Sequence, residues 1–168
     1  GYSRKGSIAT ETLAAAAGGV TSLCCPPLTK PVLDTPAVAE LILDRAREAG
    51  HTKVFPIGAL SKGLAGEQLA ELVALRDAGC VAFGNGLAPL AGNRNLRRAL
   101  EYAATFDLTV IFHSQDSDLA EGGLAHEGAA ASFLGLSGIP DTAETVALAR
   151  NLLLVERSGV RAHFAQLT

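Results

Sequence analysis

The sequence is poor in cysteine, and its few cysteines are not spaced for a disulfide framework or a zinc knuckle. Cys24, Cys25 and Cys80 form no CxxC pair. An odd count without paired spacing is typical of a reducing, cytosolic compartment, so we expect a cytoplasmic protein. Cys24 and Cys25 are neighbours in a predicted strand, where consecutive side chains point to opposite faces, so they are poorly placed to share one metal. We expect the cysteines to be small, buried hydrophobic residues.

Long apolar runs and basic clusters are missing as well. No apolar run approaches the roughly 20 residues that a membrane-spanning helix needs, and no signal-peptide pattern is present. The formal net charge is −3, and the one locally basic stretch, residues 94–98, has the pattern of a solvated helix turn. These absences predict that the protein binds neither a membrane nor a nucleic acid.

The sequence does contain enough apolar residues for a core. Its 168 residues are 48% hydrophobic and 18% charged, which suits one globular domain. Hydrophobic periodicity, capping residues and glycine stops predict helices that alternate with short apolar strands. The expected helices span residues 9–19, 35–50, 66–79, 95–106 and 141–159, and the expected strands span residues 20–25, 53–60, 80–85, 108–114 and 160–166.

Two of these helices have specific start signals. Thr35 is a good N-cap, and Pro36 follows it at the first helical position. Asp141 and Glu144 have the spacing of a capping box. Residues 115–140 are predicted to form a long loop, with one helical turn in the stretch "EGAAASFLG".

The alternation of helices and strands predicts a parallel sheet with helices packed on it. The strands are nearly continuous apolar runs, as expected for parallel strands that are covered on both faces. No GxGxxG follows the first strand, so a dinucleotide-binding fold is poorly supported, and a closed (β/α)8 barrel needs eight units rather than five. We therefore predict an α/β fold that is part of a TIM barrel, with residues 1–168 as the central segment of one longer barrel domain.

Candidate chemistry lies where the predicted strands end, because sites in such folds gather there. The stretch "LTVIFHS" delivers His113 to this edge, and Asp116 follows three residues later. Asn85 and Gln166 follow neighbouring strands, but neutral amides are poor zinc ligands. The residues alone therefore favour His113 as a hydrogen-bonded histidine at a strand end over His113 as a metal ligand. His163 lies three residues before Gln166 in a strand and is expected on the opposite face.

Other combinations at this edge stay open. The spacing permits a nucleophilic set of Ser61, His113 and Asp116, although neither Ser61 nor Ser114, the two serines at this edge, lies in a GxSxG elbow. Lys30 and Lys62 are either anion ligands or solvated side chains. The run from Gly84 to Gly86 could form a turn with positive φ.

Several longer stretches resemble one family in the same order along the chain. These are "KGSIATETLAAAAGGVTSLCCPPLTKPVLDTPAVAELI", "VFPIGALSKGLAGEQLAEL", "LRRALEYAATFDLTVIFHSQDSDLAEGGLAHEG" and "LGLSGIP". Together they are similar to the barrel of dihydroorotases, which belong to the amidohydrolase superfamily. The resemblance implies a zinc-activated hydroxide that interconverts N-carbamoyl-L-aspartate and dihydroorotate in pyrimidine biosynthesis. It also implies an HxH motif before Gly1 and a late aspartate after Thr168.

The family's site residues carry over poorly. Where the family has "FSDDG", this chain has "FGNGL" with Asn85, and where it has "HCED", this chain has "HSQD" with His113 retained. The family's "HxxHxS" corresponds to "HFAQLT", so Gln166 stands in place of the ligand histidine although His163 remains. The "MPNT" stretch corresponds to "PPLT", with Leu28 in place of the asparagine that helps to hold substrate. The resemblance thus leaves His113 as a vestigial metal position and assigns no catalytic or substrate-binding residue.

From this resemblance we expect a catalytically inactive dihydroorotase homologue without a cofactor. Such homologues are structural partners of the catalytic chain of aspartate transcarbamoylase in a hetero-oligomer. The alternative is an active, zinc-dependent dihydroorotase with an atypical ligand set that includes His113. A third hypothesis is a small-molecule binding module that uses the pocket around Leu28, Asn85, His113 and Gln166.

Overall fold

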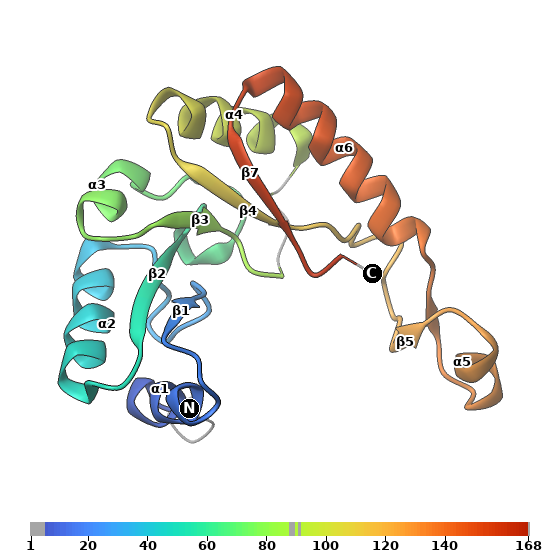
Figure 1. Cartoon of the computed structure of the whole chain (residues 1–168). Helices are drawn as coiled ribbons and strands as arrows, with labels where there is room; N and C mark the ends of the chain where they lie inside the picture. Colours follow the sequence, from blue (N-terminus) through green and yellow to red (C-terminus); the bar gives the residue numbers. More distant parts are fainter. Residues whose placement is uncertain (1–5, 88–89, 91, 168) are drawn as a thin grey trace.

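A curved parallel sheet organises the chain, and the computed structural model describes residues 6–87, 90 and 92–167. Five strands run in the order β1-β2-β3-β4-β7, and every neighbouring pair is parallel. Their bounds are β1 Ser22–Cys25, β2 Lys53–Ala59, β3 Ala82–Gly84, β4 Thr109–His113 and β7 Arg161–Ala165. The strand order follows the chain order, as in a barrel, and the sheet bends into an arc (Figure 1). The predicted partial (β/α)8 barrel is confirmed.

Helices lie along the convex side of this arc (Figure 1). They are α1 Ile8–Ala17, α2 Pro36–Ala49, α3 Leu72–Asp77, α4 Gly92–Thr105 and α6 Thr142–Ser158. A short 3-10 turn, η2 Lys62–Leu64, follows the end of β2. A small arm projects beyond α6. It contains α5 Ala129–Phe133 between the paired two-residue strands β5 Ala125–His126 and β6 Gly138–Ile139. None of the helices among the described residues is long and apolar enough to cross a membrane.

The core lies between the helices and one face of the sheet. The strand register places Phe83 beside Gly58 and Val110, so these residues share the convex face. A Cβ atom at Gly58 would lie 2.9 Å from the Phe83 ring and 3.3 Å from the Leu75 side chain of α3, which explains why a glycine occupies this position. Phe83, Leu75 and Val110 are fully buried, as a close-packed interior requires.

The concave face is much more open. Cys24, Phe55 and His163 alternate with the core residues along their strands, and all three are exposed. The prediction that the cysteines are buried is therefore wrong for Cys24, and it holds for Cys80, which is 4% exposed. The predicted opposite orientation of Cys24 and its neighbour is consistent with the alternating burial of β1.

The helix ends confirm some of the predicted signals and correct others. Pro36 opens α2, and Gly50 and Gly159 end their helices in the left-handed region, at φ 67° and 70°. The capping box predicted at Asp141 is absent, because this residue has helical dihedrals and its side chain accepts no capping hydrogen bond. A capping box does form at Ser7, which exchanges hydrogen bonds with Thr10 at the start of α1.

The helix predicted for residues 66–79 is shorter than expected. Only Leu72–Asp77 is helical, since the preceding residues turn back along the end of β2. Ser61 and Leu69 form an antiparallel bridge there, and the Ala70 amide donates to the Leu60 carbonyl at 3.0 Å. These backbone hydrogen bonds compete with the helical ones, so tertiary pairing overrides the helical pattern of the sequence.

Candidate functional site

The carboxyl ends of β2, β3, β4 and β7 meet at one rim of the sheet. Ser61, Asn85, His113 and Gln166 all lie at or just beyond these strand ends, as the sequence predicted. Two cavities open at this rim. One of about 330 Å³ is lined by Asn85, His113 and the start of α4, and one of about 630 Å³ is lined by His113, Gln166 and the base of the arm.

Asn85 is held in a hydrogen-bond network rather than directed freely into a cavity. It is 6% exposed, and its Oδ1 accepts from the Ser61 hydroxyl at 2.7 Å and from the Ser61 amide at 3.3 Å. Its Nδ2 donates to the Leu64 carbonyl at 3.3 Å. The Gly66 amide in turn donates to the Ser61 Oγ at 2.9 Å. The amide of Asn85 therefore connects the end of β3 to the whole turn from Ser61 to Gly66.

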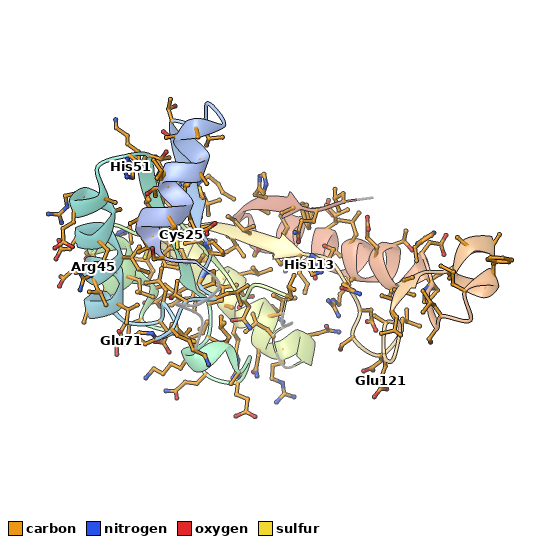
Figure 2. All side chains as sticks on the ribbon, turned by 90° about the horizontal axis from the view of Figure 1, so that it is seen from below. Cys25, Arg45, His51, Glu71, His113 and Glu121 are labelled. Atoms are coloured by element: carbon orange, nitrogen blue, oxygen red, sulfur yellow. The ribbon has the colours of Figure 1, made fainter. Side chains whose placement is uncertain are left out.

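His113 lies at the end of β4, where one ring nitrogen is paired and the other is not. Its Nε2 lies 3.0 Å from Oε1 of Gln115, which is compatible with donation by the Nε2–H tautomer. Its Nδ1 is buried and has no hydrogen-bond partner among the residues that the structure describes. Figure 2 shows this histidine at the end of its strand, with Glu121 farther out along the projecting segment. The interpretation of His113 as a hydrogen-bonded strand-end histidine fits Nε2 but leaves Nδ1 unexplained.

The structure does not assemble a nucleophilic set from Ser61, His113 and Asp116. The Ser61 hydroxyl donates to Asn85, and Asp116 accepts the backbone amides of Asp118 and Leu119 at 3.1 and 3.2 Å. The second carboxylate oxygen of Asp116 lies 3.9 Å from the Arg150 guanidinium. The Ser61 hydroxyl and the Asp116 carboxylate are thus each engaged by groups other than His113.

Gln166 directly follows β7 and is exposed, with a left-handed φ of 59°. This backbone turn stops the alternation of side chains, so a simple count along the strand does not give the direction of Gln166. His163 pairs in register with Ile111, which places it on the concave face that His113 also shares. His163 is exposed on this face.

The remaining candidates are peripheral. Lys30 and Lys62 are both exposed. Leu28 is 48% exposed and lies close to Gly86, where a Cβ atom would meet the Leu28 side chain at 2.8 Å. Gly86 has the positive φ that the sequence suggested, at 62°.

Asn151 is a site-supporting residue that the sequence analysis missed. It lies on α6, is 2% exposed, and its Nδ2 donates to the Ser114 hydroxyl at 3.2 Å. The contact fixes α6 against the end of β4. The signal was available, because Ala143, Ala147 and Asn151 occupy successive i, i+4 positions on the buried face of this helix.

The donor set that this chain supplies does not fit the zinc centre that the family resemblance implies. Zinc requires three or four His, Cys or carboxylate ligands that converge on the metal. The described residues contain no group of three such side chains placed to hold a metal ion. Asn85 stands where the resemblance implies a ligand, and its carbonyl oxygen already accepts two hydrogen bonds from Ser61. Among the described residues at the positions where the resemblance implies ligands, His113 alone has a ligand-type side chain.

Comparison with solved structures supports the class of fold. The chain superimposes on the L-hydantoinase (dihydropyrimidinase) of Arthrobacter aurescens with a TM-score of 0.73, over 94% of this chain and 36% of that one. The sequence identity is 20%, so this likeness concerns the fold. The chain therefore has the fold of part of an α/β barrel of the kind found in that protein.

Sequence comparison then gives the family. The Dihydro-orotase-like family matches residues 1–168, and the chain belongs to it. It is 82% identical to a "Dihydroorotase-like protein" of Pseudomonas putida and 81% identical to one of Pseudomonas aeruginosa. A "Dihydroorotase" of Syntrophobacter fumaroxidans is 51% identical. All three matches cover this whole chain, which spans about 40% of the length of these relatives.

Proposed function

We propose that this chain is part of a catalytically inactive dihydroorotase homologue that acts as a structural partner of aspartate transcarbamoylase in pyrimidine biosynthesis. In this role the barrel contributes surface and rigidity rather than chemistry, and the protein needs no zinc. Function is carried by sites rather than by folds, so the family alone does not decide between a scaffold and an enzyme.

The observation that carries the proposal is the engagement of Asn85. An active centre needs an anionic or imidazole donor that is free to bind the metal. Here a neutral amide stands at the position, and its oxygen already accepts hydrogen bonds from the amide and the hydroxyl of Ser61. Gln166 supplies a second neutral amide in place of a ligand histidine. The high identity to relatives named dihydroorotase-like, rather than dihydroorotase, points in the same direction.

One observation favours the alternative, an active zinc-dependent dihydroorotase with an atypical ligand set. A buried ring nitrogen without a partner is costly, and among the described residues Nδ1 of His113 is such an atom, on a side chain that lines a cavity of about 630 Å³. A metal bound there would satisfy it. His163, on the same concave face, is a further imidazole within the described part of the chain.

The test uses a protein of the relatives' length that carries this segment, purified with and without the aspartate transcarbamoylase of the same organism. We expect no stoichiometric zinc by elemental analysis, no cyclisation of N-carbamoyl-L-aspartate with added zinc, and co-elution with the transferase on size exclusion. The Syntrophobacter fumaroxidans dihydroorotase serves as the positive control for turnover. Turnover that depends on zinc would establish the alternative instead, and separate elution would remove the partnership.

A further inference from the structure

Asn85 has a defined mechanical role in the turn that follows β2. This turn, residues 61–66, contains two consecutive left-handed residues, Gly63 and Leu64, each with φ 59°. A leucine in this region is strained by roughly 1 kcal/mol, so surrounding contacts must hold it in place. The Leu64 carbonyl receives the Nδ2 hydrogen of Asn85, and the Gly63 amide donates to Asp34 Oδ2 at 2.7 Å.

The chemistry of an amide suits this role, and the chemistry of a carboxylate does not. The turn presents donors, from Ser61, and an acceptor, from Leu64, to the same side chain. An amide carries one acceptor oxygen and one donor nitrogen, so it satisfies both. An ionised carboxylate has acceptors alone, and its second oxygen would face the Leu64 carbonyl with no hydrogen between them.

We infer that Asn85 is a loop-anchoring residue, that the 61–66 turn is built around its amide, and that restoring an acid at this position does not restore a metal site. Where the family resemblance implies an acid, this chain has an amide whose donor and acceptor are both used by the surrounding turn. A single substitution back to an acid would therefore disturb the turn. The inference concerns this chain's own packing, and it holds whether or not the transferase is the partner.

The test is Asn85→Asp, alone and combined with Gln166→His, in a protein of the relatives' length. Lys62 is exposed and lies within the turn, so tryptic cleavage after Lys62 reports opening of the turn. We expect Asn85→Asp to lower Tm by about 1–4 °C and to raise the rate of cleavage at Lys62 by about tenfold or more. We expect neither variant to bind a stoichiometric zinc ion when zinc is titrated by calorimetry.

The matched control is Asn93→Asp, the same chemical change at an exposed position in the first turn of α4. It should leave Tm and Lys62 cleavage unchanged, because a carboxylate is tolerated or favoured near a helix N-terminus. If Asn85→Asp fails to fold, Ser61→Ala decides, since it removes the hydroxyl between Asn85 and Gly66 and should also speed cleavage at Lys62. One bound zinc in either variant that carries Asn85→Asp, or unchanged cleavage in both Asn85→Asp and Ser61→Ala, would overturn the inference.

Discussion

The two faces of the sheet differ in what their side chains contact. On the convex face, Phe83 and Val110 are buried beneath helices, and the core is continuous from α2 to α4. On the concave face, Phe55 is 39% exposed and His163 faces solvent. The same five strands therefore support a tightly packed side and an open side, and the difference arises from the period-two alternation of each strand.

The face of the sheet that determines stability is therefore not the face that carries the candidate site. Substitutions on the convex face should cost free energy of unfolding, whereas the concave face and its rim are where side chains can change identity without collapse of the fold. The rim network of Asn85 is the exception, since it lies on the site side but is buried.

The largest effect is expected when the convex face loses its central ring. Phe83→Ala should lower the free energy of unfolding by about 3–5 kcal/mol, because it leaves a cavity between Gly58, Leu75 and Val110. The matched substitution Phe55→Ala should cost about 1 kcal/mol or less, since that ring is already partly in water. Denaturant unfolding at constant m-value gives both numbers. Equal costs would show that the concave face is covered in the protein under test, and would remove the contrast.

A smaller effect should depend on pH, through Cys80 on the packed side. Burial raises the pKa of the Cys80 thiol from the ordinary 9.0 to about 11, and Cys25 adds to the rise. The unfolded chain therefore ionises first as the pH increases, so stability is complete below about pH 9 and falls as the pH rises toward 11. The loss is at most about 2–3 kcal/mol.

Unfolding measured between pH 8 and pH 11 checks this, with Cys80→Ala and Cys24→Ala as the paired variants. Cys80→Ala should reduce the fall in the free energy of unfolding with rising pH. Cys24→Ala, at an exposed position on the concave face, should leave most of that fall unchanged. An identical slope in the Cys80→Ala variant would contradict the assignment.

Much of this architecture could be predicted from sequence, because it depends on local patterns. The apolar strands, Pro36 at a helix start and the glycine stops at Gly50 and Gly159 each report a backbone preference that operates within a few residues. The prediction of a helix over residues 66–79 was wrong for its first turns. There, backbone groups form hydrogen bonds with the residues that follow β2 instead of with one another.

The site was predictable only as a set of positions. Parallel strands bring Asn85, His113 and Gln166 to one rim, and the sequence therefore indicated that rim. It could not indicate that the Asn85 amide would bind Ser61, a residue 24 positions away, because no spacing rule connects side chains across two strand ends. Nor could it show that Gln166 leaves its strand through a left-handed turn.

The smallest effects should come from two neighbouring residues of β7 that face opposite ways. Phe164 stacks on Phe112 with ring centroids 5.1 Å apart, on the packed face. Phe164→Leu keeps apolar volume but removes the ring contact, and it should cost about 1 kcal/mol. His163→Gln, one residue away on the open face, should change stability by less than about 0.5 kcal/mol. Parallel urea titrations of the two variants measure this difference between adjacent positions of one strand. A larger cost for His163→Gln would mean that the imidazole has a partner on the concave face, and would strengthen the case for the metal-dependent alternative.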